Sequence, residues 1–472
     1  MTDTDVLVVG GGISGLATAW WLSRAGIPTT LWEQRAKPGG KIRSDSINGY
    51  LLEQGATMVM NFRPEVDQFI SDAGLDKLKI RRDALAEEKR YLLQRGRLVT
   101  VPTRLGRVPF SSAWSLNGKL RMLIEPLIRK GGSETETVSE FIRRRLGKEL
   151  LETAMEPFVS GTLASDADLA NAYSVMPRLT ALEQRYGSIV IGVIANKLRK
   201  RCTAMKSEVF SFRGGMATLI DRLTDTLRIS GEAGFQSQIS VTSVERRNDA
   251  WIVYADSPTG AQTISARQVV LCTPASVSAS LVQELDSELS HLLGDIHYAA
   301  MSVVHLGLDL AKVEHPMNGT GFLVPRKEAL TISGTLWMSA IFPDRSPTGK
   351  ALLTTYLGGP RHPEAVEWSD ERSVDTVLGD IGSILGIKAG PEMVHVHRDH
   401  QALPLYHGSY YGRCNAIRNR VEQLPGLHLQ ANYLGGISVR DRLLTSKATA
   451  LQIMEKLGLP PKFGILFPVT GI

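Results

Sequence analysis

A glycine cluster near the N-terminus constrains the fold of this chain more than any other feature. The segment LVVGGGISGL, residues 7–16, joins a valine-rich run to an apolar helical segment, so its glycines lie at a strand-to-helix turn. In such a turn Gly10 permits a sharp reversal, Gly12 lets the backbone approach a pyrophosphate, and Gly15 allows the helix to pack on the strand. The pattern predicts a Rossmann-like dinucleotide-binding unit, and the structural alternative is a glycine-rich turn that binds nothing.

The residues that follow the turn favour FAD as the dinucleotide. A second strand-like run, Thr29 to Glu33, ends in an acid at the distance where a carboxylate accepts hydrogen bonds from a ribose diol. Further glycines follow at Gly39, Gly40 and Gly55. An elongated, buried flavin nucleotide needs this many close backbone approaches, whereas a loosely held nicotinamide does not.

Length and cysteine content limit the class of protein. A chain of 472 residues exceeds the size of one hydrophobic core, so two or three domains are expected. Cys202, Cys272 and Cys414 form no CxxC pair, which predicts neither a disulfide framework nor a zinc site and favours a reducing compartment. The N-terminus leaves no room for a cleavable signal, and the apolar runs are far shorter than the ~20 residues of a spanning helix. We therefore expect a cytoplasmic protein.

Positive charge is concentrated between residues 115 and 206 of a chain with a formal net charge of +6. Leucine spacing and a Thr137–Glu140 pair typical of a capping box predict mainly helices there, with a kink or boundary at Pro126. No RNA-binding motif or DNA-reading helix accompanies the charge, so nucleic-acid binding is not expected. An anionic membrane surface and a solvated helix face both remain as interpretations. The basic residues are Arg143, Arg144, Arg145, Lys148, Lys197, Arg199, Lys200, Arg201 and Lys206.

After residue 206 the pattern changes to strands. Three short β-runs between residues 239 and 272 predict a meander, and alternating runs from about 285 to 425 predict an antiparallel sheet covered by helices. A last strand, a second glycine turn and a long helix then follow. The backbone N–H groups at the start of that helix are expected to hold the other end of an extended dinucleotide.

Several of these segments together resemble the oxygen-dependent protoporphyrinogen oxidases, a family within the flavin amine oxidase superfamily. The likeness runs from residue 6 to about 457, and FVSGT, FPDRSP and GGISV are its most specific parts. The segments are GGGISGLA, LLEQG, FVSGTLASDADL, SFRGGMATLID, SGTLWMSAIFPDRSP, LLTTYLGG and LPGLHLQANYLGGISVRD.

The resemblance implies an α/β fold with three parts. These are a Rossmann-like FAD-binding domain, an antiparallel-sheet substrate domain and an inserted helical membrane-associating domain. The FAD-binding domain would comprise residues 1–60, 207–280 and 426–472, the substrate domain 61–89 and 281–425, and the helical domain 90–206.

The resemblance also implies a set of FAD contacts. The glycine turn and Glu33 would bind the ADP half, and Val241 would contact adenine through its backbone. The turn from Gly55 to Met58 would lie near the ribityl chain and flavin, and the start of the last helix beside the pyrophosphate or flavin. The full set is Gly10, Gly11, Gly12, Ile13, Ser14, Gly15, Glu33, Gly40, Lys41, Gly55, Ala56, Thr57, Met58, Val241, Ile437, Ser438 and Val439.

For the substrate, the resemblance implies a large apolar site with at least one cation. Arg90 matches the arginine that pairs with a propionate, and Leu323 and Leu336 match the pair that sandwiches a pyrrole ring. Tyr356 lies where the family places a stacking phenylalanine, and Gly161 matches a backbone position that lines the cavity. Without the family, Arg90 would be an exposed strand residue and the others ordinary core residues.

The implied reaction is the oxidation of protoporphyrinogen IX to protoporphyrin IX by molecular oxygen, with release of hydrogen peroxide, in heme biosynthesis. The cofactor performs the redox step, so no catalytic acid or base is assigned. The sequence does not separate this activity from that of a coproporphyrinogen III oxidase of similar fold. The other hypotheses are an amine or carotenoid oxidoreductase and a non-catalytic flavin-folded scaffold. Amine oxidases typically have a Lys in the strand that corresponds to HYAAMSVVHLGL, and this chain has none there. The sequence leaves three points open: whether the protein binds a membrane peripherally, whether it passes its product to a ferrochelatase, and whether it forms a homodimer.

Three features depart from the family or fit no assigned role. Asp399 stands near the place where the family often has Trp, which puts a flavin contact there in doubt. His395 and His397 would share one face of a strand, but no ligand spacing supports a metal site, so none is predicted. The apolar tail KFGILFPVTGI covers the core or touches a membrane.

Overall fold

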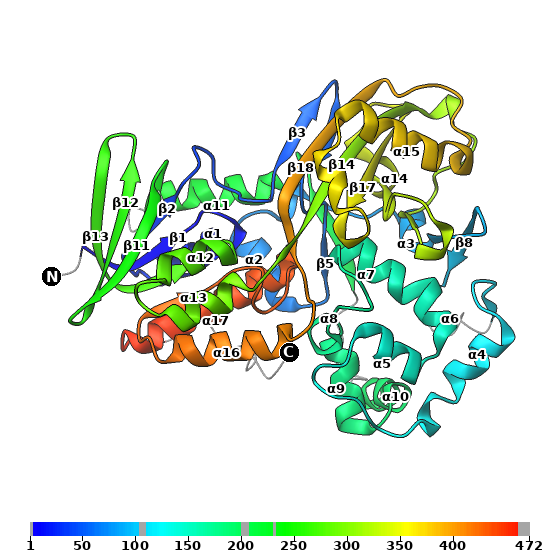
Figure 1. Cartoon of the computed structure of the whole chain (residues 1–472). Coiled ribbons are helices and arrows are strands. Elements are labelled where there is room, and N and C mark those ends of the chain that lie inside the picture. The colour runs from blue at the N-terminus through cyan, green and yellow to red at the C-terminus, as the bar shows by residue number, and fades with distance from the viewer. Residues whose placement is uncertain (1–2, 103–109, 200–206, 230–232, 461–472) are drawn as a thin grey trace.

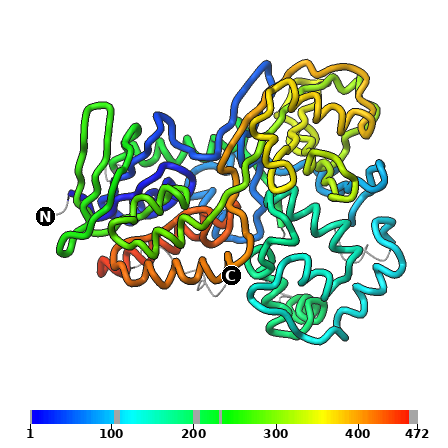
Figure 2. Tube along the Cα trace, in the orientation of Figure 1, coloured from blue at the N-terminus to red at the C-terminus, as the bar shows by residue number. Residues whose placement is uncertain are grey.

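A computed structural model describes residues 3–102, 110–199, 207–229 and 233–460 (Figure 1). Cys202, Lys200, Arg201, Lys206 and the apolar tail lie outside these residues. Figure 1 shows three groups of elements: one around β1 and β13, one around β14 and β17, and a helical group from α4 to α10. In Figure 2, blue, green and orange segments of the chain connect the first group to the second.

The first group is built on a seven-stranded sheet with β1 near its centre. β1 pairs in parallel with β2 and β13, and β13 and β12 continue into an antiparallel meander with β11. Val6 and Val8 pack with helices α1, α11 and α17, while Leu7 and Val9 pack with α12, α13 and α16. The sheet is therefore covered on both faces. Its strands are β1 (Thr4–Val9), β2 (Thr29–Glu33), β10 (Ala233–Ser237), β11 (Ser240–Arg247), β12 (Ala250–Ser257), β13 (Gly260–Leu271) and β19 (Leu427–Leu429). Its helices are α1 (Ile13–Arg24), α11 (Ala217–Ile229), α12 (Ala275–Val282), α13 (Ser287–Gly294), α16 (Tyr410–Glu422) and α17 (Val439–Lys456).

The second group contains another seven-stranded sheet, in the order β18-β14-β17-β16-β15-β7-β8. All neighbouring pairs are antiparallel except β15 and β7, which are parallel, so the sheet is mixed rather than fully antiparallel as expected. One of its faces packs against α15 (Asp370–Leu385). The strands are β7 (Arg90–Gln94), β8 (Arg97–Val101), β14 (Tyr298–Asp309), β15 (Gly321–Leu323), β16 (Gly334–Trp337), β17 (Lys350–Gly358) and β18 (Met393–Pro404), with α14 (Met338–Ile341) after β16.

Two small sheets and two short helices join the groups. β5 (Val59–Asn61), β9 (Glu208–Phe212) and β6 (Lys79–Arg81) form an antiparallel trio, and β3 (Ser44–Ile47) pairs with β4 (Tyr50–Glu53). The short helices are α2 (Pro64–Asp72) and α3 (Ala84–Glu88).

The helical group confirms several local predictions. The Thr137–Glu140 capping box is present at the start of α5, and α4 ends at Leu123, just before the turn that contains Pro126. The helices are α4 (Leu116–Leu123), α5 (Val138–Arg145), α6 (Lys148–Leu150), α7 (Glu156–Leu163), α8 (Ala172–Val175), α9 (Pro177–Tyr186) and α10 (Ile189–Arg199).

Part of the basic run turns inward, and the arginines of that part form ion pairs within the helical group instead of a solvated face or a membrane patch. Arg145 is fully buried and forms an ion pair with the fully buried Glu125. The Glu125 carboxylate also accepts hydrogen bonds from the backbone N–H groups of Ile189 and Val190 at the start of α10. Arg144 pairs with Glu136 and Glu183. These charges hold the helices of the group together.

The structure confirms a mixed α/β fold with several sheets. Within the residues described, no helix is both long and apolar enough to cross a bilayer.

Replacing Glu125 by Gln should lower the apparent free energy of unfolding by about 3 kcal/mol, because the buried Arg145 would lose its nearest carboxylate and keep only Glu183, 3.4 Å away. Urea denaturation followed by circular dichroism measures the change. Glu152→Gln is the matched control, because Glu152 is exposed and makes only a weak pair with Lys148. Equal stability of the Glu125 variant and the control would contradict the structural role of the buried pair.

Candidate active site

The glycine turn has the backbone geometry that only glycine tolerates. Gly10 has a φ of +104°, and its N–H donates to the Trp32 carbonyl at 2.8 Å. A Cβ on Gly15 would lie 1.9 Å from the Gly10 carbonyl oxygen, so no larger residue fits at the start of α1. The turn therefore brings the start of α1 tightly against β1 and β2.

The N-terminus of α1 is open, because no side chain caps it. Gly12 is the N-cap residue, and Ile13 and Ser14 begin the helix. The Gly39 N–H donates to the Gly11 carbonyl at 2.8 Å, which brings Gly40 over the turn. Apart from its chain neighbours, the nearest atom to a Cβ on Gly12 would be the Cα of Gly40, 4.0 Å away. The free N–H groups and this backbone-lined space fit the pyrophosphate of a dinucleotide.

Glu33 is held against the same turn. Its carboxylate accepts hydrogen bonds from the Gly11 N–H at 2.6 Å and the Arg35 N–H at 2.8 Å, one on each oxygen. Each oxygen keeps a second lone pair, so the geometry fits a ribose hydroxyl as well. The Ile239 N–H donates to the Glu33 carbonyl, which places the start of β11, and with it Val241, beside this acid.

The N-terminus of α17 differs from that of α1, because a side chain caps it. Ser438 caps α17, accepting from the Asp441 N–H at 3.2 Å, so one of the N–H groups expected to face the ligand is already occupied. The Ser446 hydroxyl donates to the Ser14 carbonyl at 3.1 Å, which fixes α17 against α1. Ile437 and Val439 flank the cap on either side.

The backbone at Lys41 is in close contact with the turn at Gly55, because a Cβ on Gly55 would be 2.1 Å from the Lys41 carbonyl oxygen. The Lys41 ammonium forms an ion pair with Asp399 at 2.6 Å. Burial raises the pKa of Asp399, but the charge and hydrogen bond of Lys41 outweigh it and hold that pKa below its usual value. Where the family often has Trp, this chain therefore has a charged link between β18 and residue 41. The sequence flagged Asp399 but gave no sign of its partner.

A second polar link, which is buried, brings three of the family-like segments together. Glu53, in LLEQG, accepts from the Met216 N–H at 2.9 Å, in SFRGGM, and its Oε1 lies 3.7 Å from the Arg345 guanidinium, in FPDRSP. Arg345 is fully buried and donates to the Ser211 hydroxyl at 2.7 Å. Segments far apart in sequence thus meet at one buried acid.

Three of the expected substrate residues share one face of the second sheet. Leu323 lies directly opposite Gly334, which lies directly opposite Tyr356. Opposed residues point to the same face, and Leu336 joins them because it is two residues beyond Gly334. All three side chains are half-buried, whereas the alternate residues on these strands are buried against α15.

This face, which we call the substrate face, lies against residues 41–58. Tyr356 makes a side-chain hydrogen bond with Thr57, and Leu336 and Met58 pack on the same apolar cluster. Burial, aided by the charge of Glu53, raises the pKa of Tyr356, so its phenol stays protonated. A Cβ on Gly161 of α7 would lie 2.5 Å from the Leu323 side chain, so α7 passes close over Leu323. The structure thus brings the expected substrate residues next to the expected flavin turn.

Arg90 lies at the edge of the substrate face. Leu92 is opposite Leu323, and Arg90 is two residues before Leu92, so all three point the same way. The Arg90 side chain is exposed at its end of the strand, and no ion pair within 4 Å is present for it among the described residues. Burial of part of the side chain lowers the pKa of Arg90, while the charge of Glu87 opposes that shift.

Three histidines, His305, His395 and His397, also lie on the substrate face, beyond Tyr356. His305 is buried and its pKa is lowered to about 3, first by burial and then by the charges of His395 and His397. Among the described residues, no group of His, Cys, Asp or Glu has metal-ligand geometry.

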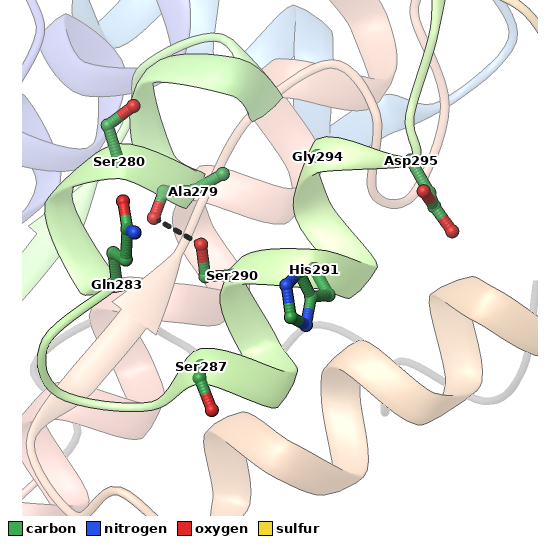
Figure 3. A pocket seen from close by; sticks show the side chains of 8 residues that line it. All are labelled: Ala279, Ser280, Gln283, Ser287, Ser290, His291, Gly294 and Asp295. Carbon is green, nitrogen blue, oxygen red and sulfur yellow. Dashed lines mark hydrogen bonds between the residues drawn. The ribbon is translucent and has the colours of Figure 1, made fainter.

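A shallow hollow of about 320 Å³ lies outside this region, between α12 and α13 (Figure 3). It is lined by small polar side chains, and the Ser290 hydroxyl donates to the Ala279 carbonyl across it at 2.9 Å. None of the residues expected to bind cofactor or substrate lines it.

A family model described as flavin containing amine oxidoreductase matches residues 13–454. The chain belongs to this family. Protoporphyrinogen oxidase of Nicotiana tabacum mitochondria is 32% identical, over 95% of this chain and 94% of that protein. Coproporphyrinogen III oxidase of Bacillus subtilis is 26% identical, over 96% of this chain and 98% of that protein. A solved structure from Exiguobacterium sp. 255-15 shares the fold, with a TM-score of 0.78, 23% identity and coverage of 97% and 100%.

Membership confirms the expected enzyme class and cofactor: this chain is a flavin-dependent oxidoreductase that uses FAD. The individual FAD and substrate contacts stay predictions. The sequence named Lys41 as an FAD contact but not its ion pair with Asp399, because that pair joins distant segments.

Replacing Gly12 by Ala should release FAD while lowering the stability of the apoprotein by no more than about 1 kcal/mol, because the added methyl would meet only the Gly40 Cα, at 4.0 Å. Flavin absorbance after gel filtration, with urea denaturation of the apoprotein, measures both effects. Gly15→Ala is the contrasting variant and should lose stability as well as flavin. Full flavin retention in the Gly12 variant would show that the space does not hold the dinucleotide.

Proposed function

We propose that the protein oxidises protoporphyrinogen IX to protoporphyrin IX with molecular oxygen and releases hydrogen peroxide. The observation that carries this proposal is the substrate face itself. It presents apolar side chains beside the Gly55 to Met58 turn and a guanidinium at its edge. A large, flexible tetrapyrrole with propionate groups has the matching chemistry.

Each residue on this face has a separate role in the proposal. Leu323 and Leu336 would contact the faces of the macrocycle, and Tyr356, held by Thr57, would stack near the reacting carbon. Arg90 would pair with a propionate at the exposed edge of the site, where the charged group stays near solvent. Gly161 lets α7 approach the Leu323 side chain, and its backbone would line the site there.

The protein is required to bind, orient and exclude water rather than to transfer protons. When bound, FAD supplies the hydride acceptor that molecular oxygen regenerates. The raised pKa of Tyr356 keeps its phenol neutral, so it adds no charge beside the reacting carbon. Protons from the pyrrole nitrogens would leave to solvent, and no acid or base is assigned.

Two other activities remain as alternatives. The name of the Bacillus subtilis relative supports oxidation of coproporphyrinogen III, a substrate with four carboxylates in place of two. An amine oxidase activity is disfavoured because β14 contains no Lys.

Anaerobic mixing of the FAD-loaded protein with protoporphyrinogen IX should bleach the flavin absorbance and produce porphyrin fluorescence. Coproporphyrinogen III, tested in parallel, should react with a lower kcat/KM. Absence of bleaching with both porphyrinogens would eliminate the proposal, and a preference for coproporphyrinogen III would select the alternative.

We also propose that the helical group docks on the surface of an anionic membrane. Leu116, Leu120, Leu123 and Leu127 form an exposed stripe along α4 and the turn after it. Ile191, Ile194 and Leu198 form a second exposed stripe on α10, which packs against that turn. Exposed Arg129, Lys130 and Lys197 lie on the same segments. An apolar surface with cationic neighbours suits a bilayer interface with anionic lipid.

The double variant Leu123→Asp/Leu127→Asp should abolish sedimentation of the protein with vesicles that contain phosphatidylglycerol, because two charges would enter the apolar stripe. Leu310→Asp is the control, because Leu310 is exposed on a different group. Wild-type protein that does not sediment with the vesicles at low salt would refute membrane docking without affecting the proposed activity.

A further inference from the structure

Arg82 is a half-buried cation that has no protein partner among the described residues. No ion pair within 4 Å and no side-chain hydrogen bond is present for it among the described residues, and its Nε atom is buried without a hydrogen-bond partner. The nearby Asp83 carboxylate instead caps α3 by accepting from the Leu85 N–H at 2.8 Å. A buried guanidinium N–H without a partner is costly, so it points to a ligand that completes it.

The backbone directs Arg82 toward the candidate site. β6 ends at Arg81, but the Arg82 N–H still donates to the Val209 carbonyl at 2.9 Å, so the strand alternation continues for one residue. Arg82 therefore points to the same side as Ile80, whereas Arg81 points to the opposite side and pairs with Glu208. Ile80 packs on the apolar cluster that Leu336 and Met58 also contact.

Arg82 and Arg90 flank the short helix α3, one at each end. Burial and then the charge of Arg90 lower the pKa of Arg82, which reflects how close the two guanidiniums are. Glu87 of α3 is the acid that acts on both groups, but it pairs directly with neither within 4 Å. Neither guanidinium therefore has a direct acidic partner among the described residues.

We propose that Arg82 is a second substrate-carboxylate ligand that acts together with Arg90, so that two guanidiniums receive two carboxylates of one tetrapyrrole. This inference rests on the proposed function, because it assigns a further residue to the same site. One guanidinium at each end of α3 would fix the orientation of the macrocycle on the substrate face.

The test compares Arg82→Gln, Arg90→Gln and the control Arg81→Gln in the FAD-loaded protein. Arg82→Gln should raise KM for protoporphyrinogen IX roughly tenfold, with kcat and flavin content unchanged, because it loses a charge-assisted hydrogen bond. Binding of the product protoporphyrin IX, followed by its fluorescence, should weaken equally. Arg81 is 78% exposed, so its variant should behave as wild type.

The dimethyl ester of protoporphyrin IX separates recognition from a structural role. Arg82→Gln should bind the ester as well as wild type does, because the ester has no carboxylate to lose. Equal weakening for acid and ester, or an unchanged KM, would overturn the role of Arg82. A wild-type protein that oxidises no porphyrinogen would instead refute the proposed function.

If the Arg82 variant does not fold, the wild-type protein provides the readout. Protoporphyrin IX should protect Arg82 from modification by phenylglyoxal, as mapped by mass spectrometry, while Arg81 reacts at an unchanged rate. Equal modification of Arg82 with and without the porphyrin would overturn the inference.

Discussion

The alternation of side chains across β15, β16 and β17 is the constraint on which the site depends. One set of residues on these strands is buried against α15, and this fixes which residues face the other way. Leu323, Leu336 and Tyr356 belong to the second set. A shift of one residue in any of these strands would exchange the two faces and remove the apolar surface from the side of the flavin turn.

Polar links hold that face at a fixed place relative to the dinucleotide turn. Glu53 of β4 accepts from the Met216 backbone, just before α11, and lies near Arg345, between α14 and β17. Lys41 pairs with Asp399 and so joins the segment after β2 to β18 of the second sheet. Burial raises the pKa of Glu53 to about 7, against the hydrogen bonds from Ser44 and Met216 and the charge of Arg345. The site is thus positioned by contacts outside the residues that would touch substrate.

Local patterns predicted the parts of the structure that depend on neighbouring residues. The glycine turn, the capping box at Thr137 and the strand that holds His395 and His397 all follow from short-range rules. The parallel pairing of β7 with β15, the burial of Arg145 and the Lys41–Asp399 pair could not be predicted this way. Each depends on which distant segments meet, and no local spacing encodes that. Family resemblance supplied the substrate residues, but it gave no reason to single out Arg82.

The central claim is that one face of the mixed sheet receives a planar macrocycle beside the flavin turn. A crystal structure of the FAD-loaded protein with protoporphyrin IX bound tests it most directly. The account predicts a ring between the Leu323 and Leu336 side chains, with the flavin next to Thr57. A macrocycle bound elsewhere, or side chains of the protein filling that face, would contradict it.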